Sequence, residues 1–254
     1  MPAEDADRWL RRFHPGPPHG ARLVCLPHAG GSAGFYFPLS AALAADCEVV
    51  AVQYPGRQDR RAEPCVTDLG ELADRIAAVL GTLDGRPLVL FGHSMGALLG
   101  YEAARRLTAA GGPAPAALLA SGRRAPATHR DERVHLMDDD GLLRELRLLD
   151  GTAHQVLADE ELLRMVLPAI RADYTAAETY RHRPGPELDC AVTVLVGRDD
   201  PRVTRAEAEA WRGHTSGPFE LHTFPGGHFY LTAHQRAVTD LVRAAVRSVP
   251  SPGR

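Results

Sequence analysis

The chain of 254 residues contains no lysine, so arginine supplies all 29 of its basic residues. Acidic residues number 32, and the formal net charge is −3 at pH 7 with neutral histidines. A balance this close to neutral gives no general attraction to nucleic acid or to an anionic membrane surface. We therefore expect a protein that binds neither. The bias towards arginine, beside abundant Ala, Gly and Pro, is attributed to a GC-rich genome.

Long apolar stretches are also missing. None approaches the roughly 18 apolar residues of a membrane-spanning helix, and residues 1–20 lack the apolar core of a signal peptide. The four cysteines are scattered, and no two of them form a CxxC pair. We therefore expect a reduced, cytoplasmic protein, in which Cys25 is buried within an apolar segment.

Motifs for metal ions and cofactors are absent as well. The sequence has no HExxH motif, no GxGxxG motif after a predicted strand and no cluster of metal ligands. We expect an activity that requires neither a metal ion nor a redox cofactor. The length and the 44% content of hydrophobic residues are ordinary for a globular protein, and we predict a single domain over residues 1–254.

Short apolar segments alternate with helical patterns along most of the chain. Strands are expected at 22–26, 48–53, 87–91, 116–120, 192–196 and 219–224, and helices at 35–45, 67–81, 94–110, 204–212 and 233–247. The alternation predicts βαβ units, and the continuous apolar character of the strands predicts burial on both faces. The expected fold class is therefore α/β, with a mostly parallel central sheet flanked by helices.

One long stretch, between the strands expected at 116–120 and 192–196, has no strand pattern. Leucines at helical spacing predict a helix over 138–151, and a second helix is predicted over 158–180. Pro168 should kink or divide the second helix. We interpret residues 123–185 as a helical lid inserted over the sheet, lining an apolar pocket with few polar groups.

The segment FGHSMGALLG, residues 91–100, joins an expected strand to an expected helix. Serine is favoured at helix N-termini, so Ser94 has an ordinary interpretation as a helix-capping residue. The alternative is a nucleophile elbow, Gly92-x-Ser94-x-Gly96, where the serine occupies a strained turn and the glycines permit close approach of the backbone. Residues in the loops that follow the other expected strands indicate whether Ser94 is a helix cap or a nucleophile.

The loop LPHAGGSAGF, residues 26–35, follows the strand expected at 22–26. Its two adjacent glycines would allow the Ala29 N–H to point at an oxyanion, with the Met95 N–H as the second donor. The simpler interpretation of this loop is a tight turn without a catalytic role.

Two further loops leave the carboxyl ends of strands, where ligands bind in open parallel sheets. In GRDDPRV, residues 197–203, Asp199 and Asp200 are both candidates for a carboxylate that orients a histidine. Asp200 is favoured because Pro201 restricts it to an extended conformation, which leaves Asp199 as a capping or surface residue.

The second of these loops, PGGHFYL, residues 225–231, carries His228. The other histidines considered are less well placed: His222 in a strand, His234 at a helix start and His93 beside the serine. The order Ser94, Asp200, His228 along the chain is that of the α/β-hydrolases. We therefore predict that Ser94 is the nucleophile, His228 the base and Asp200 the acid.

Longer segments resemble type II thioesterases, the stand-alone editing hydrolases of polyketide and nonribosomal peptide assembly lines. The resemblance extends from about residue 20 to 247 and is carried by PHAGGSAGFY, VQYPGRQDRR, FGHSMGALLGYEAARRL, LPAIRADYTAAETY and GGHFYL. QYPGRQDR is specific because it is not a general feature of α/β-hydrolases. Two small departures lie outside the predicted triad: Tyr230 stands where Phe is expected, and Ala153 stands where Pro is expected.

The resemblance implies an α/β-hydrolase fold with the triad on Ser94, Asp200 and His228 and the oxyanion donors on Ala29 and Met95. It implies hydrolysis of acyl groups from the phosphopantetheine arm of acyl or peptidyl carrier proteins, which would be the partners of an enzyme expected to be monomeric. The alternatives are an esterase or lipase that acts on small esters, and a non-catalytic binding module.

The arginines of the family-specific segment allow two interpretations. Arg57, Arg60 and Arg61 could contact the acidic surface or the phosphate of a carrier protein. Alternatively, Arg57 braces its own loop by pairing with a carboxylate such as Glu63, which is the interpretation we favour. Four arginines near the entrance of the expected lid could likewise contact a carrier protein, but a solvated charged surface is the interpretation we favour for them: Arg123, Arg124, Arg130 and Arg133.

Overall fold

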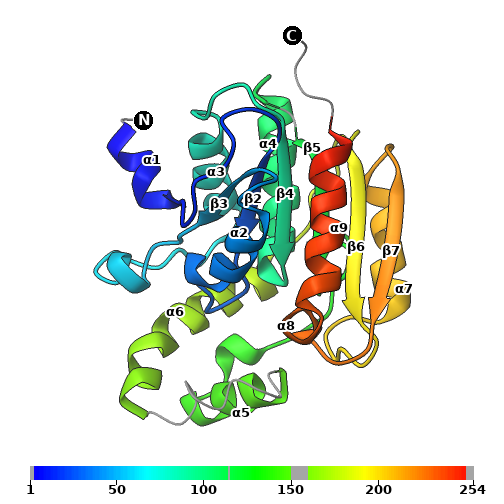
Figure 1. The fold of residues 1–254 in the computed structure, drawn as a ribbon. Coiled ribbons are helices and arrows are strands. Elements are labelled where there is room, and N and C mark those ends of the chain that lie inside the picture. The colour runs from blue at the N-terminus through cyan, green and yellow to red at the C-terminus, as the bar shows by residue number, and fades with distance from the viewer. Residues whose placement is uncertain (1–2, 114, 150–159, 250–254) are drawn as a thin grey trace.

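The computed structural model describes residues 3–113, 115–149 and 160–249, and a seven-stranded sheet forms its centre (Figure 1). The strands are β1 (Leu10–Arg11), β2 (Arg22–Leu26), β3 (Glu48–Val52), β4 (Leu88–His93), β5 (Pro115–Ser121), β6 (Ala191–Gly197) and β7 (Phe219–Phe224). Their order across the sheet is β1-β3-β2-β4-β5-β6-β7. All neighbours are parallel except β1, which is antiparallel to β3. The six expected strands are present, and β1 was not predicted because two residues form no pattern.

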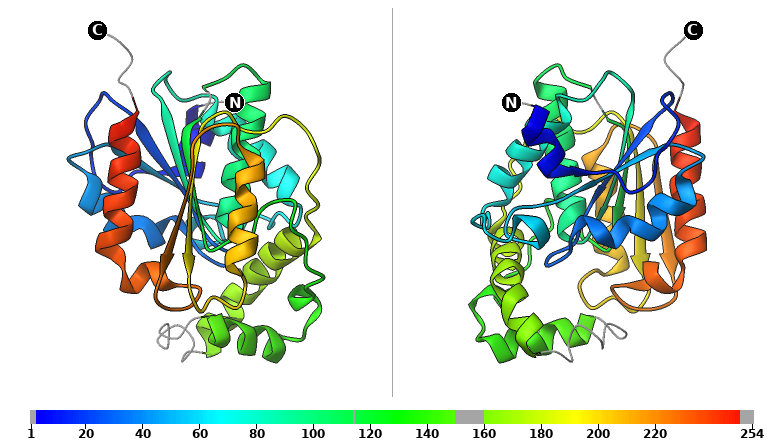
Figure 2. Two further views of the ribbon diagram at one scale, coloured as in Figure 1. Left: turned by 90° about the vertical axis from the view of Figure 1, so that its right-hand side faces the viewer. Right: turned by 60° about the vertical axis from the view of Figure 1, so that its left-hand side comes forward.

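Helices cover both faces of this sheet (Figures 1 and 2). They are α1 (Ala3–Trp9), α2 (Phe37–Leu43), α3 (Leu69–Leu80), α4 (Met95–Ala109), α5 (Asp139–Leu149), α6 (Glu160–Thr179), α7 (Arg205–Glu209), α8 (Tyr230–Ala233) and α9 (Gln235–Ser248). Side-chain caps fix some of the helix starts: the Asp68 carboxylate accepts the Glu71 N–H at 2.7 Å before α3. A reciprocal capping box of Thr204 and Glu207 begins α7.

The core consists of two clusters, one on each face of the sheet. Val24 and Leu26 of β2 pack in the cluster that contains α3 and α4, whereas Leu23 and Cys25 pack in the cluster that contains α2 and α9. Successive side chains of a strand point to opposite faces, so a strand covered on both sides is apolar at every position. The continuous apolar segments of the sequence follow directly from this layering.

The helical insertion (described here over residues 123–149 and 160–185) lies beyond the carboxyl ends of the strands (Figure 1). Its helices α5 and α6, with a short turn at Val134–Leu136, share a small apolar cluster that includes Leu142 and Ile170. The expected division of the second helix is wrong, because α6 continues through Pro168. Residues 150–159, with the expected helix end at Gly151 and the departure at Ala153, lie outside the described residues.

The cysteines and the helices bear on the expectations drawn from composition. All four cysteines are free thiols, and Cys25 is buried in β2 as expected. In the ranges that the structure describes, none of the helices has both the length and the apolar character that crossing a bilayer requires.

Candidate active site

Ser94 occupies a sharp turn between β4 and α4. Its backbone has φ 54° and ψ −117°, a conformation that a non-glycine residue adopts only at the expense of strain. The flanking glycines make the turn possible, because a Cβ atom at Gly92 would overlap the carbonyl of Gly96, and one at Gly96 would overlap the carbonyl of Leu26. The Ser94 side chain makes no capping hydrogen bond to α4. This is the geometry of a nucleophile elbow rather than of a helix cap.

His228 and Asp200 meet at the same edge of the sheet. His228 Nδ1 lies 2.8 Å from Asp200 Oδ2, and both side chains are almost completely buried. The second carboxylate oxygen, Oδ1, accepts the Arg202 N–H at 2.8 Å, which orients the carboxylate. Asp199 is exposed instead, so the structure brings the second aspartate of the pair, and not the first, to the histidine.

One cavity of about 260 Å³ contains the predicted site. Ser94 and His228 line it, together with the two residues predicted to form the oxyanion hole, Ala29 and Met95. Met95 is the first residue of α4, so its N–H has no intrahelical acceptor and is available to a ligand. The structure therefore gathers all four of these residues around a single space.

The walls of this cavity differ in polarity. Apolar side chains of the insertion line it, namely Leu146, Leu149, Val166, Ile170 and Ala177. Charged side chains line it as well, namely Arg123, Glu132, Glu178 and Arg202. The expectation of an apolar pocket with few polar groups is therefore wrong, because four charged residues far apart in sequence converge on it.

Two further histidines lie near His228. The ring centroids of His93 and His228 lie 4.9 Å apart, and His28 lies 5.9 Å from His93. Burial, reinforced by the proximity of His228, lowers the pKa of His93 well below its usual value and that of His28 to about 3. Both rings are therefore neutral at neutral pH, and neither adds a positive charge near His228.

His93 is held by a buried chain of hydroxyl groups. Its Nδ1 lies 2.9 Å from Ser121 Oγ, which in turn lies 2.6 Å from the Tyr230 hydroxyl. A phenylalanine at position 230 would lack that hydroxyl. The departure from the expected family pattern thus adds a hydrogen-bond partner behind the ring that packs on His228.

A buried ion pair joins the loop of Ala29 to the insertion. Arg57 forms a bidentate pair with Asp173 of α6 at 2.6 and 2.8 Å, and the same carboxylate accepts the Gly30 N–H at 2.7 Å. Although burial opposes a charge on Arg57, the Asp173 carboxylate raises the pKa of Arg57 above its usual value. The bracing role expected for Arg57 is thus observed, but with Asp173 as partner; Glu63 pairs with Arg60 instead.

We expect Arg57→Met to lower the free energy of unfolding by about 3–5 kcal/mol, because it leaves the Asp173 carboxylate buried without its cation. The matched control is Arg75→Met, which breaks a solvent-exposed pair with Glu71 and should change stability by less than about 1 kcal/mol. Denaturant unfolding of the two variants measures both values, and equal losses would contradict the expectation.

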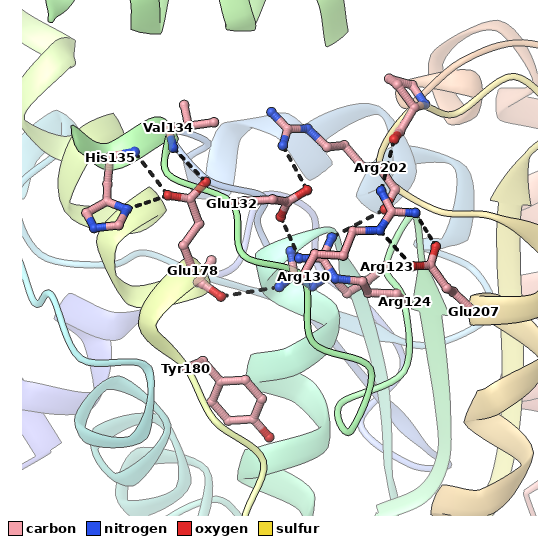
Figure 3. A network of polar contacts seen from close by, with 12 residues as sticks. Arg123, Arg124, Arg130, Glu132, Val134, His135, Glu178, Tyr180, Arg202 and Glu207 are labelled. Carbon is pink, nitrogen blue, oxygen red and sulfur yellow. Dashed lines mark hydrogen bonds and ion pairs between the residues drawn. The ribbon is translucent and has the colours of Figure 1, made fainter. Parts of the chain in front are cut away.

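Most arginines near the insertion are paired rather than freely solvated (Figure 3). Arg124 pairs with Glu132, and Arg130 pairs with Glu207. Of the four arginines for which a solvated surface was expected, only Arg133 fits, since it is exposed and pairs with the exposed Asp131. The expectation is wrong for Arg124, which is buried, and for Arg123, which lines the cavity.

The fold and this site define the class of the protein. A mostly parallel sheet with a strained serine turn after a central strand, and with an Asp–His pair on later strand ends, is the arrangement of the α/β-hydrolases. The comparisons with known proteins narrow the class: the Thioesterase domain family matches residues 21–246. The chain belongs to the thioesterase family, and it is a serine hydrolase that acts on thioesters.

Individual relatives agree with this assignment. The probable cadicidin biosynthesis thioesterase of Streptomyces griseus is 58% identical over 242 residues, which are 95% of this chain and 67% of that protein. Thioesterase PikA5 of Streptomyces venezuelae is 52% identical over 229 residues, 89% of this chain and 81% of that one. The structure of the type II thioesterase BorB from the borrelidin biosynthetic cluster has a TM-score of 0.90 and 56% identity, covering 95% of this chain and 98% of that one. The resemblance to type II thioesterases is thus confirmed.

Proposed function

We propose that this enzyme hydrolyses acyl groups carried as thioesters on the phosphopantetheine arms of carrier proteins, and so edits an assembly line for polyketides or nonribosomal peptides. The observation that carries the proposal is the strained Ser94 in one cavity with His228, which is itself paired with Asp200. The similarity to BorB and to the cadicidin thioesterase supports the biosynthetic setting. The proposal takes the enzyme to act in the cytoplasm as a monomer.

The first chemical step in this proposal is acylation of Ser94. His228 accepts the Ser94 proton as the hydroxyl attacks the thioester carbonyl, and Asp200 stabilises the imidazolium that forms. The N–H groups of Ala29 and Met95 stabilise the oxyanion of the tetrahedral intermediate. Collapse of this intermediate breaks the C–S bond, and the proton on His228 goes to the departing thiol of the phosphopantetheine arm.

The second step hydrolyses the acyl-enzyme and releases the acyl group as a free carboxylic acid. His228 removes a proton from a water molecule, which attacks the carbonyl of the acyl-Ser94 ester, and the same two N–H groups stabilise the second oxyanion. The proton returns from His228 to Ser94 as the ester bond breaks. The neutral rings of His28 and His93 favour this role, because neither adds a positive charge that would oppose the imidazolium of His228.

The helical insertion is proposed to act as a lid that lines the acyl site. Leu146→Trp places a larger side chain in the cavity wall, so longer acyl chains should be excluded first. We expect kcat/KM for an octanoyl thioester to fall at least about tenfold relative to an acetyl thioester, a change of the order that a hydrophobic pocket gives per methylene. Rates for a series of acyl thioesters measure this preference.

Leu148→Trp is the matched control for this prediction. Leu148 lies on the same helix, α5, but its side chain is exposed and does not line the cavity. The control should keep the wild-type preference, and Ser94 should react with a small fluorophosphonate probe in both variants. An unchanged preference in Leu146→Trp would contradict the proposed role of the insertion.

The main test of the proposed function compares two forms of one acyl group. We expect a higher kcat/KM for the acyl carrier protein thioester than for the same acyl group on N-acetylcysteamine. Contacts remote from the carbonyl can lower the barrier at the reacting centre, and the truncated thioester lacks them. Equal efficiency would mean that the carrier is not recognised, and the enzyme would then be a general hydrolase of small thioesters.

Two simple measurements test the alternative functions, an esterase for small esters and a non-catalytic binding module. Faster turnover of p-nitrophenyl esters than of carrier thioesters would favour an esterase that acts on small esters. Absence of labelling by a fluorophosphonate probe would favour a non-catalytic binding module, because that probe requires a reactive serine.

A further inference from the structure

Arg123 stands in the wall of the catalytic cavity, two residues beyond the end of β5. Its backbone is fixed on two sides: its carbonyl accepts the Trp211 Nε1–H at 2.8 Å, and the preceding Gly122 donates its N–H to Leu195 at 2.8 Å. Gly122 has φ 59°, and a Cβ atom there would collide with the ring of His93. Arg123 is thus placed by the same tightly packed turn that adjoins the histidines of the site.

The guanidinium of Arg123 is poorly satisfied. Among the residues that the structure describes, its one hydrogen bond runs from Nη2 to the Ala177 carbonyl at 3.3 Å, and its buried Nε has no partner. An arginine has five N–H donors, and an unpaired buried donor lowers stability. By contrast, Arg124, Arg130 and Arg202 each contact a carboxylate (Figure 3).

The carboxylates nearest to Arg123 in the cavity wall pair with other groups. Glu132 binds Arg124 with one oxygen and Arg202 with the other. Both oxygens of Glu178 accept backbone N–H groups, those of Val134 and His135. Burial, together with the positive charge of Arg124, lowers the pKa of Arg123 to about 9, so the group is still a cation at neutral pH.

We propose that Arg123 determines specificity by donating hydrogen bonds to an oxygen atom of the acyl chain bound in the cavity. The inference rests on the proposed function and adds a substrate class to it: acyl groups that carry a keto, hydroxyl or carboxylate oxygen, in preference to hydrocarbon chains of equal length. The acyl chain packs against Leu146 and Leu149, which line the same cavity as Arg123, while its oxygen accepts a hydrogen bond from the Arg123 guanidinium.

The test uses four N-acetylcysteamine thioesters: butyryl, 3-hydroxybutyryl, 3-oxobutyryl and succinyl. For Arg123→Met we expect kcat/KM to fall about ten- to a hundredfold on at least one oxygen-bearing substrate, the range for losing a hydrogen bond to a charged group. The value for butyryl should stay within about twofold, because that chain offers no oxygen beyond the thioester carbonyl. A loss on succinyl alone identifies a carboxylate ligand, and a loss on the other two identifies a neutral oxygen.

The control is Arg133→Met, which removes an exposed arginine of the same connecting segment and should leave all four values unchanged. A second measurement requires no variant: the wild-type enzyme should prefer at least one of the three oxygen-bearing substrates over butyryl by about tenfold. An equal fall on all four substrates, or no wild-type preference, would overturn the role of Arg123 alone. Failure of the wild-type enzyme to hydrolyse any thioester would instead overturn the proposed function, and this inference with it.

Discussion

Replacing Ser94 by alanine is expected to lower kcat for thioester hydrolysis by about 10⁴-fold or more while the protein remains folded. The variant lacks the hydroxyl that forms the acyl-enzyme, whereas the oxyanion donors and the cavity are retained. Alanine has the same Cβ atom as serine, so the strained turn between β4 and α4 should persist. Circular dichroism reports the fold, and release of free thiol from an acyl thioester reports the activity.

His228→Ala should cause a loss of similar size, and combining it with Ser94→Ala should cause little more. The losses of activity caused by replacing members of one catalytic unit are not additive, because each residue depends on the others for its effect. A folded Ser94→Ala protein that retains near-wild-type turnover would falsify the proposed mechanism. Losses that multiply in the double variant would show that the two residues do not act together.

The second large effect is expected at the triad carboxylate, Asp200. Asp200→Asn is expected to lower kcat by about 10⁴-fold. The amide removes the negative charge that stabilises the imidazolium of His228, and it can present a donor to Nδ1 where the mechanism needs an acceptor. Asp200 is buried against His228, so solvent cannot replace the lost interaction.

The adjacent aspartate is a matched control for that variant. Asp199 is exposed and does not contact the histidine, so Asp199→Asn should keep kcat within about twofold of the wild-type value, as is usual for surface substitutions. Measuring both variants under the same conditions separates the roles of two neighbouring carboxylates. A larger loss of kcat in Asp199→Asn than in Asp200→Asn would show that Asp200 is not the carboxylate that orients His228.

Much of the fold and of the site could be predicted because the evidence is local. A buried parallel strand appears in the sequence as a short apolar segment. Glycine, proline or polar residues mark the start of the loop that follows it. Pro201 restricts the backbone of the residue before it to extended conformations, and Asp200 is preferred to Asp199 for that reason. Ser94 and His228 could be predicted as candidates because both lie just beyond strand ends, where ligands bind in open parallel sheets.

Other features could not be predicted because they join distant segments. Arg57 and Asp173 are 116 residues apart, and the sequence offers nearer carboxylates such as Glu63 as partners. The charged wall of the cavity arises in the same way, since Arg123 and Arg202 come from different strand ends. A single sequence indicates which side chains carry charge, but the folded chain decides which of them meet.

The two edges of the sheet have a consequence for self-association. An exposed edge strand offers unpaired N–H and C=O groups to another chain, and proteins protect such edges with short strands or charged side chains. Here one edge is the two-residue β1, which covers part of β3. The other edge is β7, where Glu220 is exposed and pairs with His222. Neither edge is a long apolar template, so two molecules that meet edge to edge cannot readily merge their sheets into one.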